Sequence, residues 1–163
     1  MRERDAEFRA FYIAEAGGLK RLALMMTGNE EVAADLSQEA LVRAYRAWHR
    51  IRERDAGPYV RRILVNLVRN AHRRRLVELR HQRPVVAETG SHDTRVENAM
   101  RVAEALEVLS PVRKATILLR YYEDMSEAQI AEVLDRPLNT VKSDIRRALE
   151  KMRPVLDEGA TAV

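Results

Sequence analysis

The stretch SEAQIAEVLDRPLNTVKSDIRR, residues 126–147, has the outline of a helix-turn-helix. Ser126 stands where its hydroxyl accepts the Gln129 N–H while the Gln129 side chain reaches back, which is a capping box that begins the first helix. The tripeptide Asp-Arg-Pro at 135–137 ends that helix, because proline donates no N–H and disfavours helical geometry in the residue before it. The pattern therefore predicts two helices joined by a short turn.

The second of these helices is expected to have two different faces. Val141, Ile145 and Leu149 form an apolar stripe toward the first helix. Off that stripe lie four residues that a DNA major groove can accept, namely Lys142, Ser143, Arg146 and Arg147. An ordinary amphipathic hairpin with a solvated basic face fits the same pattern, so the motif favours duplex DNA binding but leaves that alternative open.

The composition predicts an all-α protein. The chain has 163 residues, 46% of them hydrophobic, with only six Gly and five Pro, and it is rich in Arg, Ala, Leu and Glu, which favour helices. It contains no cysteine, which excludes disulfides and thiolate metal sites. No N-terminal apolar run and no stretch of about 18 apolar residues is present, so we expect a cytoplasmic protein without membrane insertion.

Positive charge is concentrated in two islands. The net charge is only +4, but residues 61–83 hold eight Arg against one Glu, and residues 136–153 hold six basic residues against two acidic ones. The rest of the chain is therefore net acidic. Because counterion release rewards a local density of positive charge, two basic islands in an acidic body are typical of a protein that binds a polyanion.

The stretch RPVVAETGSHDTR, residues 83–95, mixes Pro, Gly, Ser and Thr and is predicted to be a flexible linker. It separates two small helical domains, 1–82 and 96–155, with a tail at 156–163. The helices expected from periodicity, caps and glycines are 4–16 and 19–26, broken by Gly17-Gly18, then 30–50, 58–79, 96–109 and 111–122, followed by the helix-turn-helix.

The helix expected from residue 58 onward has two contrasting faces. Spacings of three and four residues keep Tyr59, Arg62, Asn66, Arg69 and Arg73 together on a polar face, opposite the apolar stripe of Val60, Ile63, Leu64 and Leu67. An aromatic ring, an amide and aligned arginines can stack on an unpaired base, read its edge and bind phosphates. A solvated surface is the alternative, but like charges at this spacing repel unless a partner neutralises them.

Together with DLSQEALVRAYRAW at 35–48, these motifs resemble the extracytoplasmic-function class of bacterial RNA polymerase sigma factors, in particular the SigE-like kind of the sigma-70 superfamily. The resemblance covers nearly the whole chain. It implies that the first unit is sigma domain 2, the second is sigma domain 4, and a flexible linker joins them.

The resemblance also implies roles for individual residues. The segment at 35–48 is similar to the region that binds the beta-prime clamp helices of core polymerase, which makes Asp35, Gln38 and Glu39 the expected polymerase contacts. Sigma domain 4 is expected to meet the beta flap. A capped amphipathic helix without a polymerase role is the alternative for this segment.

The run PYVRRILVNLVRN, residues 58–70, resembles the region that melts the promoter and reads the minus-ten element. An Asn matching Asn66 lies there beside the pocket for a flipped base, and the loop at 51–57 is expected to form the pocket's rim. Tyr59 stands where many relatives have Trp. A smaller ring still stacks, so we expect the same kind of contact.

The helix beginning near Leu138 is assigned by the resemblance to the minus-thirty-five element, with Lys142, Ser143 and Arg146 as its expected contacts. Arginine offers bidentate geometry toward guanine. Two positions depart from the common family pattern. Asn139 replaces a frequent Gly, and Asp144 is an acidic residue where a basic residue is usual. Asp144 is expected either to accept a hydrogen bond from a cytosine amine or to pair with a neighbouring basic residue such as Arg147 and orient it.

These observations predict a non-catalytic subunit that directs core RNA polymerase to promoter DNA and aids its opening. We expect no cofactor, metal or small-molecule substrate, because the four histidines lack metal-ligand spacing and no nucleophile or phosphate-loop motif occurs. An anti-sigma factor is a further partner that the resemblance allows. The alternatives from the residues alone are a stand-alone dimeric helix-turn-helix regulator and an RNA-binding adaptor.

Overall fold

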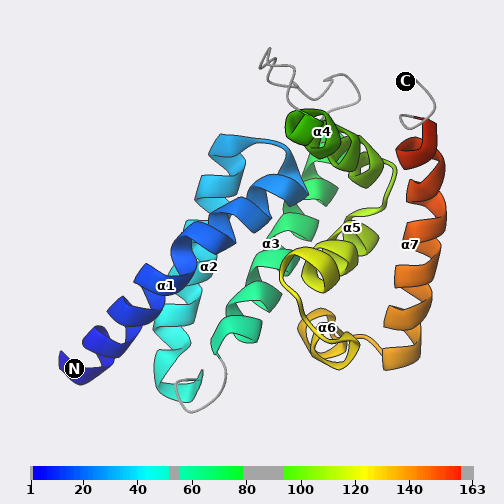
Figure 1. Ribbon diagram of the computed structural model, residues 1–163. Coiled ribbons are helices and arrows are strands. Elements are labelled where there is room, and N and C mark those ends of the chain that lie inside the picture. The colour runs from blue at the N-terminus through cyan, green and yellow to red at the C-terminus, as the bar shows by residue number, and fades with distance from the viewer. Residues whose placement is uncertain (1, 52–55, 79–93, 159–163) are drawn as a thin grey trace.

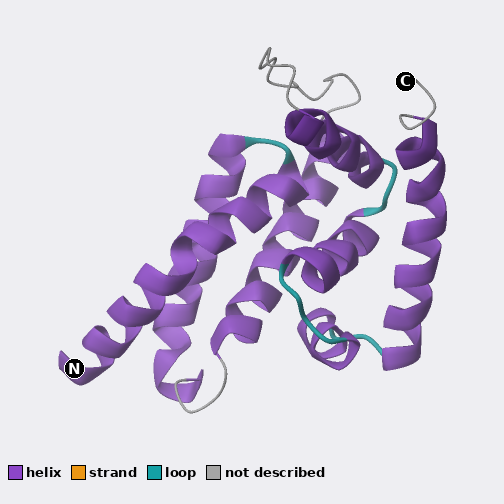
Figure 2. Ribbon diagram, viewed as in Figure 1, coloured by secondary structure: helices purple, strands orange, loops and turns teal. Residues whose placement is uncertain are grey.

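The computed structural model describes residues 2–51, 56–78 and 94–158, and every regular element in these ranges is helical (Figures 1 and 2). The elements are α1 (Arg2–Thr27), α2 (Glu30–Ile51), α3 (Ala56–Glu78), α4 (Thr94–Glu107), α5 (Pro111–Ile117), the π-helix η1 (Leu118–Tyr122), α6 (Glu127–Leu134) and α7 (Leu138–Glu158). The prediction of an all-α fold is confirmed. Most of the predicted linker and most of the predicted pocket rim lie outside the described residues.

The first helix corrects one prediction. Gly17 and Gly18 do not break it, and α1 is continuous over 26 residues from Arg2 to Thr27. Packing of α1 on its neighbours outweighs the weak helix propensity of two glycines, which costs roughly 0.5–1 kcal/mol each. The helix instead ends at Gly28, whose φ of 65° is the left-handed conformation of a helix C-terminus.

The three helices α1, α2 and α3 form the first unit (Figure 1). Asn29 begins α2, since its side-chain oxygen accepts the Val32 N–H at 3.0 Å. Four buried alanines of α2 let the neighbouring helices approach closely: Ala33, Ala40, Ala44 and Ala47. At the far end Phe8, Tyr45 and Trp48 pack edge to face or tilted, with ring centroids 4.9 and 5.2 Å from Phe8.

The second unit consists of α4 to α7. Ser110 caps α5, and the helix begins at Pro111, the first residue of the predicted range 111–122. The expected helix to Tyr122 is present, but its last turn widens into η1, where the Glu123 N–H donates to the Leu118 carbonyl at 3.0 Å. Pro154 lies inside α7, and the helix runs past it to Glu158.

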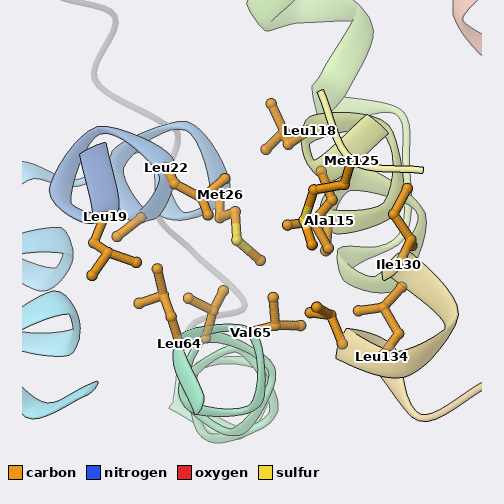
Figure 3. Packing of buried hydrophobic residues seen from close by; sticks show 14 of the residues in the cluster. Leu19, Leu22, Met26, Leu64, Val65, Ala115, Leu118, Met125, Ile130 and Leu134 are labelled. Carbon is orange, nitrogen blue, oxygen red and sulfur yellow. The ribbon is translucent and has the colours of Figure 1, made fainter. Parts of the chain in front are cut away.

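The two units share one hydrophobic core. Helix α3 packs on α1 and α2 on one side and on α5 and α6 on the other. In Figure 3, Met26, Val65, Ala115 and Leu134 come from four different helices and point into the same interior space. The described parts of the two predicted domains are therefore in direct contact.

Candidate nucleic-acid and polymerase interface

The predicted polar face of α3 is accessible at most of its positions. Arg62, Asn66 and Arg73 are exposed, and Tyr59 and Arg69 are partly buried. The opposite side of the helix is buried, and its buried residues include Val60, Leu64, Val65 and Val68.

The buried stripe of α3 is displaced from the predicted one. Ile63 and Leu67 are only partly buried, whereas Val65 and Val68, which the predicted stripe omitted, are 1% and 4% exposed. The cause is tertiary, because α5 and α6 of the second unit cover a side of α3 that a free three-helix unit would expose to water.

The N-terminal end of α3 faces α6. Tyr59, Pro58 and Arg62 line one side of a cavity of about 400 Å³, and Glu132 and Val133 of α6 line the other. Arg62 also lies 3.5 Å from the Asp135 carboxylate just after α6. Two of the five predicted single-strand contacts therefore lie against the second unit in this structure.

The helix-turn-helix forms as its sequence predicts. The Gln129 N–H donates to the Ser126 hydroxyl at 3.1 Å, and the Ser126 N–H donates to the Gln129 side-chain oxygen at 2.9 Å. At the end of α6, Asp135 adopts the left-handed conformation, with φ 51° and ψ 53°. The turn that follows delivers the chain to Leu138, the first residue of α7.

Helix α7 exposes its basic residues and buries a stripe that differs from the predicted one. Val141 and Ile145 are buried as predicted, but Leu149 is 38% exposed and its predicted place in the stripe is wrong. The interior positions continue instead through Ala148 and Met152, because a helix of 3.6 residues per turn carries position 148 over position 141.

The four candidate DNA contacts of α7 lie on its outer side. Lys142, Arg146 and Arg147 are exposed and Ser143 is partly so. The Ser143 hydroxyl donates to the Asn139 carbonyl at 3.0 Å, and Arg146 lies 3.4 Å from Glu150 one turn on. Such an exposed pair is weak and exchanges readily for a phosphate or a base.

Asp144 takes neither of its two expected roles in this structure. It is 7% exposed, and its carboxylate binds two arginines of its own unit: Arg113 of α5 at 3.3 Å and Arg136 of the turn at 2.7 Å. It therefore faces the interior rather than a groove, and its partner is not Arg147. Asp144 therefore joins α7 to the turn before it and to α5.

The predicted polymerase contacts lie on α2. Asp35 and Gln38 are exposed, and Glu39 is partly buried and pairs with Arg43 at 2.7 Å. Between them Ser37 is buried and its hydroxyl donates to the Ala34 carbonyl at 3.1 Å. The exposed side of this segment therefore carries the Asp35 carboxylate and the Gln38 amide, while the opposite side of α2 is buried.

The sequence did not single out Arg61 or Arg113, which the structure makes central. Arg61 binds Glu15 at 3.0 Å within the first unit and also pairs with Glu123 of the second. In the sequence, Arg61 stands out only as one member of the basic island at residues 61–83. Its partners lie 46 and 62 residues away, so no local pattern indicates them.

Within the described ranges, no cluster of three or more His, Asp or Glu side chains is arranged to hold a metal ion. Among the same residues, none of the helices combines the length and apolar character needed to cross a membrane.

An arginine-rich helix in one unit and a helix-turn-helix in the other are typical of the class of DNA-binding proteins. Family comparison agrees: the family model "Sigma-70 region 2" matches residues 11–76, and "Sigma-70, region 4" matches residues 99–152.

Several relatives match over most of their length, and two of them serve as examples. The RNA polymerase sigma-E factor of Streptomyces avermitilis is 32% identical over 154 residues, covering 93% of this chain and 86% of that protein. The ECF RNA polymerase sigma factor SigL of Mycobacterium tuberculosis is 31% identical, covering 94% and 90%.

Among solved structures, the sigma factor RpoE of Bartonella quintana, in complex with the anti-sigma factor NepR, shares this fold. Its TM-score is 0.77 at 21% identity, over 92% of this chain and 96% of that one. The chain belongs to the ECF class of RNA polymerase sigma factors, as its sequence motifs predicted. Its function is to direct RNA polymerase to promoters for transcription initiation.

Proposed function

We propose that the chain is a non-catalytic, cytoplasmic sigma subunit whose two units divide promoter recognition between them. The first unit binds core polymerase and captures an unpaired base of the minus-ten element, and the second reads the minus-thirty-five element as a duplex. The observation that carries this proposal is the exposed polar face of α3, where Asn66 lies between Arg62 and Arg73 at helical spacing.

The α3 face has the chemistry that a melted strand requires. A tyrosine ring can stack on a base, an amide can hydrogen-bond to a base edge, and arginines can neutralise the neighbouring phosphates. Flipping a base out of a duplex costs a few kcal/mol, and stacking returns about 1–3 kcal/mol per base. Capture of a base by Tyr59 and Asn66 therefore offsets much of the cost of unpairing it.

The α7 face has the chemistry of duplex reading. Arg146 can bind guanine through two hydrogen bonds, and Lys142 can reach guanine or phosphate. Ser143 and Arg147 flank them on the same exposed side. Asp144 supports this face from below by fixing Arg113 and Arg136, and it does not contact a base in the proposal.

Asp35, Gln38 and Glu39 are proposed to bind the beta-prime clamp helices, and the second unit to meet the beta flap. Exposed Asp35 and Gln38 on α2 support the first contact, since polar side chains at an interface rim set register and orientation. Once polymerase fixes both units, each raises the effective concentration of the other at the promoter.

We also propose an anti-sigma factor as a partner. The related sigma factor of Bartonella quintana is held in such a complex. No observation on this chain favours the stand-alone regulator or the RNA-binding adaptor.

Reconstituted transcription tests the proposed function. Purified chain is added to core RNA polymerase and a promoter library, and the initiated transcripts are sequenced. Promoter-specific initiation that depends on the chain is the expected result. Tight binding of duplex sites by the chain alone, without promoter-specific initiation, would contradict the proposal.

A further inference from the structure

The first turn of α7 exposes two side chains that the proposed duplex contacts leave unused. Leu138, the first residue of the helix, is 41% exposed, and Asn139 beside it is exposed as well. Figure 1 shows α7 at the edge of the molecule, with its first turn next to α6. In a helix-turn-helix the N-terminal residues of the second helix contact base edges, so both side chains are placed to reach them.

Asn139 lies on the same face of α7 as the proposed duplex contacts. Three of these contacts follow it by three, four and seven residues, which places them on one side of a helix with 3.6 residues per turn: Lys142, Ser143 and Arg146. The Ser143 hydroxyl donates to the Asn139 carbonyl at 3.0 Å and so joins two successive turns of this face. A groove that receives Lys142 and Arg146 therefore also receives the Asn139 side chain.

The side-chain amide of Asn139 is free to bind a ligand. Within the described ranges it has no hydrogen-bond partner, and the bond from Ser143 uses only the backbone carbonyl of Asn139. Asparagine is also a weaker helix former than alanine, so helix stability does not account for this residue at an exposed position.

Asn139 supplies a combination of donor and acceptor that its neighbours on this face lack. The major-groove edge of adenine offers N7 as an acceptor and the N6 amine as a donor, and an amide matches both at once. Lys142, Arg146 and Arg147 have donors only. The Ser143 hydroxyl has already donated its hydrogen to a carbonyl, so it accepts from a base but does not donate to N7. The basic residues therefore suit guanine, and Asn139 suits adenine.

Leu138 extends this contact toward a neighbouring base pair. It precedes Lys142 by one turn and is a large apolar side chain exposed at the N-terminal end of α7. In a major groove, apolar side chains contact the C5-methyl group of thymine. The exposed Leu138 side chain therefore favours a thymine next to the base that Asn139 contacts.

We propose that Asn139 is a specificity-determining residue of α7. Its amide selects adenine at one position of the minus-thirty-five element through hydrogen bonds to N7 and N6, and Leu138 contacts the methyl group of a thymine at an adjacent position. The inference rests on the proposed reading of duplex DNA by α7 and adds to it a base that the basic residues do not select.

The test measures the base preference of the assembled holoenzyme. Core RNA polymerase with the native chain or a variant selects promoter fragments from a library randomised over the upstream element, and sequencing of the bound fraction gives the preference at each position. Asn139→Ala should reduce the adenine preference at one position by about 5- to 150-fold, the value of one bidentate contact, and leave the other positions unchanged. Leu138→Ala should weaken a thymine preference next to that position.

Asn139→Asp separates base reading from a structural role. The carboxylate has nearly the shape of the amide but only accepts, so the preferred base should change from adenine to cytosine, whose N4 amine donates. The relative preference is the readout, because the added negative charge lowers binding to every sequence alike.

The variant Asn139→Asp should remain folded, since a negative charge in the first turn of a helix is favourable. Thermal unfolding of each variant verifies this. Asn98→Asp, on the exposed side of α4, makes the same chemical change away from α7 and is the matched control, for which every preference should stay native.

The outcomes distinguish this inference from the proposed role of α7. An unchanged adenine preference in Asn139→Ala, or a uniform fall in binding to all sequences, overturns the role of Asn139. If Arg146→Ala still alters the preference at its own position, duplex reading by α7 stands. If neither variant alters any upstream preference, the inference and the proposed duplex reading are both overturned.

Discussion

The Arg136 guanidinium lies 2.7 Å from the Asp144 carboxylate, and this contact joins the turn of the helix-turn-helix to the second turn of α7. Arg113 of α5 reaches the other carboxylate oxygen at 3.3 Å. The buried Asp144 carboxylate thereby holds α5, the turn and α7 together. Its two contacts determine how α7 is oriented, and with it the exposed side chains of Lys142 and Arg146.

Replacement of Asp144 should destabilise the chain strongly. Asp144→Ala leaves the Arg113 and Arg136 guanidinium groups close together without the carboxylate that pairs with both. Breaking a fully buried pair costs about 3–5 kcal/mol, and we expect about 2–3 kcal/mol here because both arginines keep partial contact with water. Urea unfolding measures the change. Glu150→Ala, on the exposed side of α7, should change stability by less than about 0.5 kcal/mol, and equal losses for both variants would contradict the buried role of Asp144.

Replacement of Gly18 by alanine should stabilise the protein. Gly18 lies inside α1, and a Cβ built there meets nothing within 4 Å. Removing backbone freedom from the unfolded chain should therefore add roughly 0.5–1 kcal/mol. The opposite sign is expected for Gly28→Ala, because the φ of 65° at Gly28 disfavours any side chain. Urea unfolding of both variants provides the comparison, and destabilisation by Gly18→Ala would argue against a continuous α1.

Asn66→Ala should impair promoter opening and spare polymerase binding. Loss of one amide contact to a base edge is worth about 1–3 kcal/mol, which is roughly a 5- to 150-fold lower yield of open complex. Permanganate reactivity of melted thymines measures opening, and co-migration with core polymerase measures binding. Asn98→Ala, an exposed Asn of α4 that is outside every proposed binding face, is the control. Parallel loss of opening and core binding in Asn66→Ala would reject the proposed pocket.

The parts of the fold that local chemistry decides were predictable from the sequence. The Ser126 and Gln129 capping box involves two side chains three residues apart, and it forms as predicted. Family membership likewise followed from short motifs. The predicted break at Gly17-Gly18 failed because tertiary packing of α1 outweighs local propensity.

The rest of the site depends on contacts that are distant in sequence. Val65 is buried because the second unit covers it, and Asp144 is buried because Arg113 lies opposite, 31 residues away. Arg61 binds partners in α1 and after η1. A pattern of spacing along one helix does not reveal which other helix will lie against it, so the predicted stripes were right in kind and displaced in position.

The most direct test of divided promoter reading is transcript sequencing from a library randomised at both promoter elements, with core polymerase and either the native chain or Arg146→Ala. We expect Arg146→Ala to lose about 1–3 kcal/mol of discrimination at one or two upstream positions and to keep the native preference at the minus-ten element. Equal loss of preference at both elements, or a uniform fall in initiation without any change in preference, would contradict it.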